Sequence, residues 1–398
     1  MEISSEIMNC FKNLTFKSSC TESLGKLLEE GYIKYILDSD NNQHIVLEKK
    51  VPFNNLSVEE KLYMYGVTTI PILSNGEIEL FKQNFMNEML NFPEYKRSLS
   101  DPTKTLDNNP LTYVLGGFGA FGNPSSFHNL IVRQLRLKAY HKCKKELFTT
   151  LIKSLNEAFS TEYKLEVLFD RFMYRLKNTS PTAEKWHRDV ADDKFIDDFD
   201  EIYGGWINLD DTPQYLSCIP GSHLNIKLKE LKHGFAMINK NDILHFKPYK
   251  TLIEIPPGHC VIFPQYILHE VVSKKQSYDM MRLFTGWRLT RSSESLFTNS
   301  YLEEVIEKQA SPLLPSGQKP SMYAANHASF FLKKEFMINP EKNYKANTKQ
   351  WSVSTFNDLL LKKNGIVERF LKSLEDYGFT KYSKYSEKEK YIYFPHAI

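Results

Sequence analysis

The chain has 398 residues, enough for two or three average domains or for one large domain with extensions. Hydrophobic residues make up 41% and charged residues 25%, values ordinary for a globular protein, and a net charge of +3 is too small to indicate a nucleic-acid partner. Because no apolar run approaches the length of a transmembrane helix, and no basic head precedes a long apolar block at the N-terminus, we expect neither a membrane span nor a secretory signal.

The cysteines indicate the compartment. They are odd in number, scattered, and contain no Cys-x-x-Cys pair: Cys10, Cys20, Cys143, Cys218 and Cys260. This usage predicts reduced thiols and a cytoplasmic protein.

The first ninety residues contain recognisable elements but no chemical motif before residue 60. Gly31 to Leu37 predicts a strand with one exposed face. Tyr65 to Leu73 is rich in β-branched residues and predicts a second strand. Ser74 then stands three residues before Glu77, as in a capping box, and apolar residues follow at helical spacing at Ile78, Phe81, Phe85 and Met89. A strand therefore leads into an amphipathic helix that ends before Pro93.

Residues 101–128 are rich in Pro, Asn, Gly and Ser, which predicts a long loop near a substrate. The loop contains Gly117-x-Gly119-x-x-Gly122. A dinucleotide fingerprint needs a helix opening on its last glycine, and Asn123-Pro124 follows instead. From Leu130 to Leu155 the periodicity is helical, with a basic side that is typical of a solvated helix face.

Residues 164–290 read as a β core. Short strand-like runs alternate with Gly/Pro turns, a polar loop covers 177–185, and an acidic loop covers 192–200. This spacing favours an antiparallel sandwich or barrel. The expected fold class is therefore α+β with a mainly β core.

The core contains Trp186-His187-Arg188-Asp189, the only His-x-Asp in the chain. On a strand, residues two apart point to one face, so His187 and Asp189 would aim at one point. His269 is the candidate third arm, because the intervening chain is long enough for several strands of a double-sheet jelly roll to return beside the first pair. Two His and one carboxylate form the facial ligand set of non-haem Fe(II) oxygenases. A surface His beside an Asp in a polar loop would give the same short pattern.

Two arginines are candidates for binding a carboxylate. Arg282 would lie one hairpin beyond His269, and Arg288 would share its face as an alternative; a bidentate guanidinium suits a carboxylate, although a structural ion pair would also explain either residue. Glu270 would point away from the ligand face. The other core histidines lie in turns or polar stretches and are expected to be structural or solvated: His223, His233, His245 and His259. Trp206 and Trp287 are core aromatics by default.

Taken in order, five stretches resemble the phytanoyl-CoA dioxygenase-like family of Fe(II)/2-oxoglutarate oxygenases, over roughly residues 60–290. They are Tyr65 to Ile78, Trp186 to Asp189, Gly205 to Asp211, Ile219-Pro-Gly-Ser-His223, and His269 with Arg282. The chain departs from the family between Asp211 and Pro220, where the stretch is compressed and lacks the usual Asn-Gly. The segment between His269 and Arg282 is also a little longer than common.

The resemblance implies a double-stranded β-helix (jelly roll, cupin-like) with flanking N-terminal helices. It implies His187, Asp189 and His269 as catalytic iron ligands, and Arg282 as the residue that binds the distal carboxylate of 2-oxoglutarate; Arg288 remains the alternative that strand spacing suggests. Trp206 would line the cosubstrate pocket. The implied cofactors are Fe(II), 2-oxoglutarate and O₂, with ascorbate as an accessory, and the implied reaction is hydroxylation of a small-molecule or acyl substrate with release of succinate and CO₂. Related halogenases carry a small residue where this chain has Asp189, so the carboxylate argues for hydroxylation.

The expected organisation is an N-terminal extension (1–60), an oxygenase domain with a helical buttress (61–290) and a C-terminal extension (291–398) with a helical stretch at 356–374. Two other functions fit the same residues. A jelly roll that has lost iron would be a structural or interaction protein, and a zinc hydrolase could use the same His/Asp/His set without an arginine clamp.

Overall fold

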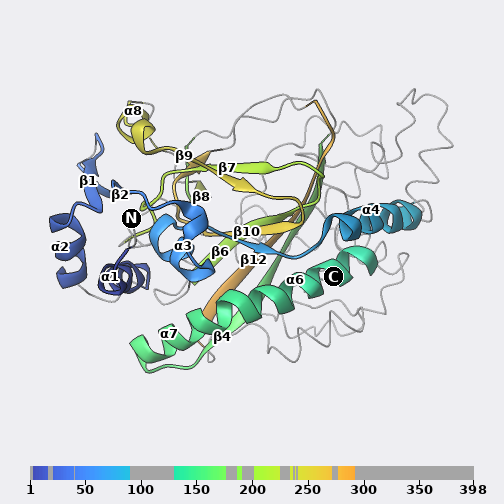
Figure 1. Ribbon diagram of the computed structural model, residues 1–398, viewed down its shortest axis with the longest axis horizontal. Coiled ribbons are helices and arrows are strands. Elements are labelled where there is room, and N and C mark those ends of the chain that lie inside the picture. Colours follow the sequence, from blue (N-terminus) through green and yellow to red (C-terminus); the bar gives the residue numbers. More distant parts are fainter. Residues whose placement is uncertain are drawn as a thin grey trace, which may run out of the picture.

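Two antiparallel sheets organise the part of the chain that the computed structural model describes (Figure 1). The larger has the order β3 (Thr68–Pro71), β10 (His259–Pro264), β6 (Glu201–Asn208), β12 (Met280–Arg291) and β4 (Tyr163–Arg175). The smaller has the order β11 (His269–Glu270), β7 (Gln214–Cys218) and β9 (Thr251–Ile255). The described residues are 3–16, 21–39, 41–89, 130–175, 186–190, 201–224, 234–235, 238, 241–270 and 277–291.

Two short ribbons complete the described strands. β1 (Ile33–Leu37) pairs with β2 (Gln43–Leu47), and β5 (Asp189–Val190) pairs with β8 (Gly234–Phe235). From β6 onward the chain moves between the sheets: β6 lies in the larger, β7 and β9 in the smaller, β10 in the larger, β11 in the smaller and β12 in the larger. This alternation brings distant segments side by side.

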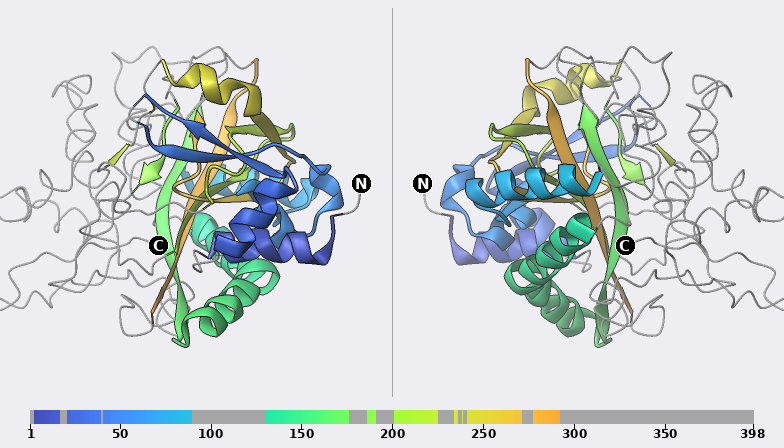
Figure 2. Two further views of the ribbon diagram at one scale, coloured as in Figure 1. Left: turned by 90° about the vertical axis from the view of Figure 1, so that its left-hand side faces the viewer. Right: turned by 90° about the vertical axis from the view of Figure 1, so that its right-hand side faces the viewer.

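Helices lie along one side of the larger sheet (Figure 2). They are α4 (Asn75–Met89), α6 (Leu130–Cys143), a π-helical segment (Lys144–Phe148) and α7 (Thr149–Phe159). Phe148 packs against Tyr203 of β6 and Trp287 of β12, with ring centroids 5.6 and 5.3 Å apart. Side chains alternate along a strand. Trp206 of β6 and Arg282 of β12 therefore lie on the opposite face of the sheet from Tyr203 and Trp287, away from the helices.

The N-terminal elements share the main core. α1 (Ser5–Thr15), α2 (Thr21–Glu29) and α3 (Val58–Tyr65) contribute buried side chains to the same hydrophobic cluster as the sheets. The remaining described helix, α8 (Ile243–Phe246), and the 3-10 turns Phe53–Asn55 and Lys247–Tyr249 are short. The domain boundaries at residues 60 and 290 stay predictions.

Several predicted elements are confirmed. The strand expected from Gly31 is β1, and Ser74 and Glu77 exchange the hydrogen bonds of a capping box at the start of α4. The helix expected from Leu130 is present, although a π-helical segment interrupts it. Cys10, Cys143, Cys218 and Cys260 are buried free thiols. None of the helices in the described ranges is long and apolar enough to cross a membrane.

The strand predicted from Tyr65 to Leu73 was wrong at its start. Tyr65 ends α3, and Gly66 caps that helix with a left-handed backbone at φ 71°, so β3 begins only at Thr68. The Gly-rich loop at 101–128, the loops at 177–185 and 192–200, His233, Cys20 and the chain beyond 291 lie outside the described residues.

Gly258 joins two strands and cannot carry a side chain without strain. Its φ is 71°, and an added Cβ would lie 2.0 Å from the carbonyl oxygen of Leu73. A left-handed backbone alone costs an L residue about 1–2 kcal/mol. Gly258→Ala is therefore expected to lower the free energy of unfolding by at least about 2 kcal/mol in a denaturant titration. Gly76→Ala, with open space around its Cβ, is the matched control and should be neutral or slightly stabilising. Equal stability of the two variants would contradict the prediction.

Candidate metal centre

Backbone pairing brings His269, the predicted third ligand, beside His187 and Asp189. His187 and His269 form an antiparallel bridge in which each N–H donates to the other's carbonyl, at 2.9 and 3.0 Å. Asp189, two residues on, pairs with Phe235 of β8. The two histidines therefore stand directly opposite each other, with Asp189 next along the same strand.

The three side chains converge. The Nε2 atom of His187 lies 3.3 Å from one Asp189 oxygen, and the Nε2 atom of His269 lies 3.5 Å from the other. One donor atom from each residue lies within 4.8 Å of the other two, and the described residues contain no other such group. Ligands about 2.1 Å from one ion and at right angles lie about 3 Å apart, so the spacing suits a single metal ion after small adjustments.

The hydrogen bond behind His269 supports a metal. Its Nδ1 lies 3.0 Å from the carbonyl oxygen of Ile267, which only accepts, so Nδ1 carries a proton. In the neutral ring, Nε2 is then a lone pair facing an Asp189 carboxylate oxygen. Two facing lone pairs repel, and a bound cation or a second proton on the ring relieves this. A hydrogen bond from the other ring nitrogen to a backbone carbonyl is the usual arrangement behind a metal-bound histidine.

Electrostatics at Asp189 favour its charged form. Burial alone would raise the pKa of Asp189, but the neighbouring rings of His269 and His187 outweigh this and hold that pKa well below its usual range. Both imidazoles are almost fully buried, whereas about a third of the Asp189 side chain is exposed (34%). The Asp189 carboxylate is therefore kept ionised beside the two imidazoles, and it is the most exposed of the three side chains.

Aromatic contacts lead from this cluster to Arg282. The ring of His269 lies 5.3 Å from Phe263, and Phe263 lies 6.1 Å from Trp206. The Arg282 guanidinium stacks 4.5 Å above the Trp206 ring. Phe263, Trp206 and Arg282 lie on the face of the larger sheet that is away from the helices. Arg282 and the His/Asp/His cluster are therefore on the same side of this sheet.

Gln214 holds Arg282 in place. Its side-chain oxygen accepts from Arg282 Nε at 2.7 Å and from Trp206 Nε1 at 2.8 Å. Its amide nitrogen donates to Asp210 Oδ2 at 2.7 Å and to the Met281 carbonyl at 3.0 Å. Each side of the amide therefore has two partners, which determines the orientation of the group. No sequence motif selects Gln214, although it lies in the compressed stretch between Asp211 and Pro220 that departs from the family pattern.

The other candidates lie elsewhere. Arg288 pairs with Ile202 on the same strand face as Arg282, but its side chain is outside the described residues. Glu270 binds Ser217 and Lys250 and does not join the cluster. The ring of His223 is buried, its Nε2 bonds to the Tyr63 carbonyl, and burial lowers its pKa to about 4, which marks a structural residue. His259 bonds to the Pro257 carbonyl through Nδ1.

Comparisons with known proteins add only weak likenesses. No family model matches the chain, and no curated protein matches its sequence. Among solved structures, an apo non-heme monooxygenase, ThoJ, is 12% identical, with a TM-score of 0.34, over 59% of this chain and 80% of its own. The alpha ketoglutarate dependent carbocyclase SnoK from nogalamycin biosynthesis is 14% identical, with a TM-score of 0.35, over 61% and 87%. EctD from S. alaskensis, with 2-oxoglutarate and 5-hydroxyectoine, is 13% identical, with a TM-score of 0.34, over 58% and 74%. These scores are too low to assign a function.

Asp210 should make stability depend on pH. Burial raises the pKa of Asp210 from about 3.8 to about 6, although hydrogen bonds from Met281 and Gln214 oppose the shift. The folded state therefore binds more protons than the unfolded state between about pH 4 and pH 6, and the Asp210 contribution to the unfolding free energy falls by about 3 kcal/mol as the pH rises through that range. Asp210→Asn removes this titration. The difference between wild-type and variant unfolding free energies should change between pH 4 and 6 and level off above 7; a constant difference would contradict the assignment.

Proposed function

We propose that this chain is an Fe(II)/2-oxoglutarate-dependent dioxygenase that hydroxylates a C–H bond of a small-molecule or acyl substrate. The convergence of His187, Asp189 and His269 from two separate strands carries the proposal. Three protein ligands on one side leave room for further ligands on the other, as Fe(II) oxygenases require. The phytanoyl-CoA dioxygenase-like relationship and a cytoplasmic location belong to the same proposal.

The strand orders support a double-stranded β-helix. After β5, the chain crosses between a β3-β10-β6-β12-β4 sheet and a β11-β7-β9 sheet, and the His187–His269 bridge extends the smaller sheet toward β5. Two facing antiparallel sheets linked in this way are the arrangement of a jelly roll. The metal cluster would then lie at one mouth of the shell, with the domain of residues 61–290 forming its wall.

Each group has a distinct task in the proposed reaction. His187, Asp189 and His269 would hold the iron, which with bound 2-oxoglutarate and O₂ supplies the oxidising power and releases succinate and CO₂. Arg282 would bind the distal carboxylate of 2-oxoglutarate. Gln214 would orient the guanidinium through its hydrogen bond, and the Trp206 ring would stack against it. Buried aromatic residues such as Phe263 would exclude water between these two anchors.

Loss of either His187 or Asp189 should abolish the activity. His187→Ala and Asp189→Ala each remove one of three ligands, so we expect anaerobic Fe(II) binding and 2-oxoglutarate-dependent succinate release to fall below detection. Circular dichroism would show that the variants fold. Wild-type levels of succinate release in either variant would rule out the triad.

The same measurements separate the alternatives. A folded wild-type protein that binds no iron would favour a structural or interaction role. Tight zinc binding with hydrolysis of ester or amide substrates, and no consumption of 2-oxoglutarate, would favour a zinc hydrolase.

Removal of Arg282 should weaken 2-oxoglutarate binding more than iron binding. A charge-assisted hydrogen bond contributes about 1.5–3 kcal/mol, so Arg282→Ala should raise the Kd for 2-oxoglutarate about 10- to 150-fold while Fe(II) affinity changes little. Gln214→Leu, which leaves the arginine but removes its acceptor, should produce a smaller loss in the same direction. A loss caused by Arg288→Ala and not by Arg282→Ala would move the carboxylate clamp to Arg288.

A further inference from the structure

Arg188 lies between the two candidate ligands His187 and Asp189 and is 1% exposed. Because side chains alternate along a strand, it points away from the face that carries the ligands. Burial lowers its pKa to about 9, which still leaves it charged at neutral pH. A buried cation is costly unless its donors are satisfied by hydrogen bonds.

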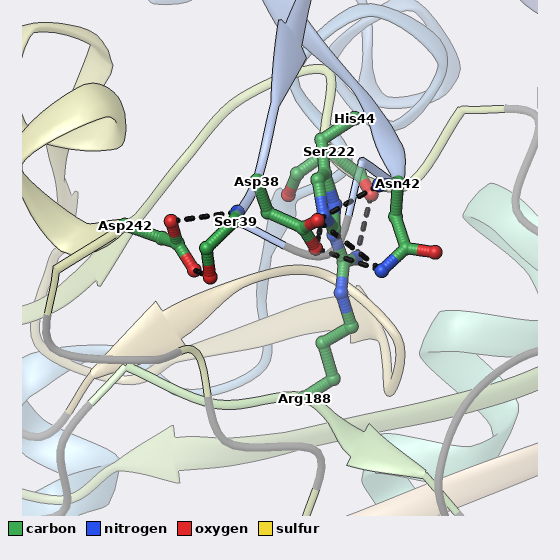
Figure 3. Close-up of polar contacts among 7 residues, drawn as sticks. All are labelled: Asp38, Ser39, Asn42, His44, Arg188, Ser222 and Asp242. Carbon is green, nitrogen blue, oxygen red and sulfur yellow. Dashed lines mark hydrogen bonds and ion pairs between the residues drawn. The ribbon is translucent and has the colours of Figure 1, made fainter.

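The Arg188 guanidinium binds three segments at once, and Figure 3 shows its contacts with two of them, at Ser222 and His44. One terminal nitrogen donates to the Ser222 carbonyl at 2.7 Å and also to the carbonyl of Tyr266. The other donates to Nδ1 of His44 at 3.3 Å. Tyr266 stands three residues before His269, and the hydroxyl of Ser222 accepts the N–H of Leu268 at 2.9 Å. Arg188 therefore joins the strand of the first two ligands to the segment that delivers the third.

His44 extends this contact to a carboxylate. Its Nδ1 accepts from Arg188, so the ring proton is on Nε2, which lies 2.9 Å from Asp38 Oδ2. Burial and the charge of Arg188 lower the pKa of His44, in keeping with a neutral ring. Asp38 also accepts hydrogen bonds from the backbone N–H and from the side-chain amide of Asn42. The result is a chain of hydrogen bonds from a carboxylate through an imidazole to the guanidinium.

The β1–β2 hairpin that carries His44 is itself anchored at both ends. At its tip, the backbone and hydroxyl of Ser39 donate to the two oxygens of Asp242, at 2.9 and 2.8 Å (Figure 3). At its base, the N–H of Leu47 donates to the Pro220 carbonyl at 2.9 Å. Gly221 allows this approach, because an added Cβ would lie 2.6 Å from the nitrogen of Leu47. The hairpin is therefore a fixed support behind the candidate metal centre.

We propose that Arg188, held by His44 of the β1–β2 hairpin, is a positioning residue that sets the spacing between the His187–Asp189 pair and His269, and that the N-terminal hairpin is thereby part of the metal centre. This inference rests on the proposed function, since it concerns the same three ligands. Groups behind the ligands of a metal site commonly change its affinity by 10- to 100-fold without touching the ion. A lysine cannot replace the arginine, because it lacks the planar fork that reaches the Ser222 and Tyr266 carbonyls and His44 together.

The test measures metal affinity separately from folding. Co(II) absorption titrations under anaerobic conditions give the Kd, and thermal unfolding of the metal-free proteins gives the stability. Arg188→Lys and Arg188→Met should bind Co(II) about 10- to 100-fold more weakly than the wild type. Arg136→Met is the matched control, since Arg136 is also a buried arginine bonded to a backbone carbonyl, that of Phe284, but on the helical side of the sheet. It should lower the melting temperature and leave the Kd for Co(II) unchanged.

A second pair of variants keeps the inference testable if Arg188 variants do not fold. His44→Leu removes the acceptor and should weaken Co(II) binding, whereas His44→Asn restores an acceptor near the position of Nδ1 and should recover most of the affinity. In the double variant His44→Leu/Arg188→Lys, the loss should be no greater than in Arg188→Lys alone, because the two residues act as one unit.

The outcomes separate this inference from the proposed function. If the wild type binds Co(II) tightly, His187→Ala does not, and the Arg188 and His44 variants bind like the wild type, the positioning role is overturned while the metal centre stands. If wild type and His187→Ala bind Co(II) equally, the proposed function fails, and the inference that rests on it fails with it.

Discussion

The candidate site depends on one backbone contact, the reciprocal pair of hydrogen bonds between His187 and His269. A single-residue slip in this register would turn one of the histidines to the opposite face, because side chains alternate along strands. Two further contacts oppose such a slip: β11 pairs with β7 through His269 and Cys218, and Arg188, next to His187, binds the carbonyls of Ser222 and Tyr266. The geometry of the three ligands is therefore a consequence of strand register.

The larger sheet separates chemistry from support. On one face, Tyr203 and Trp287 pack against the helices through Phe148. On the other face, Trp206, Phe263 and Arg282 form a row of contacts that reaches His269. Since adjacent residues on one strand serve the two faces, substitutions one position apart in β6 or β12 are expected to have different effects, on stability in one case and on the site in the other.

Two buried polar networks lie on different sides of the site. Gln214 orients Arg282 from one side, and Arg188 ties the ligand segments together from the other. The buried carboxylate of Asp210 in the first network and the buried guanidinium of Arg188 in the second each have several hydrogen-bond partners. These bonds offset the cost of removing the charges from water. Such networks favour one arrangement of the surrounding segments over near alternatives, because any displacement leaves a buried donor without an acceptor.

Sequence patterns alone predicted the local features of the chain. Alternation within Trp186–Asp189 predicted that His187 and Asp189 share a face, the Ser74–Glu77 spacing predicted a capping box, and the turn-rich stretch 164–290 predicted an antiparallel β core. These features depend on neighbours within a few residues. The selection of His269 and Arg282 came from their places among the predicted strands, to which the family resemblance added, since no local pattern links positions so far apart.

The residues that support the candidate ligands and Arg282 were identified from the packing of distant segments. No sequence motif selected Gln214, His44, Asp38 or Arg188 for a role of its own. Their roles follow from hydrogen bonds between segments up to about 144 positions apart, such as that from Arg188 to His44. Partners at such separations are determined by how the sheets and the hairpin pack, and local periodicity carries no record of that packing.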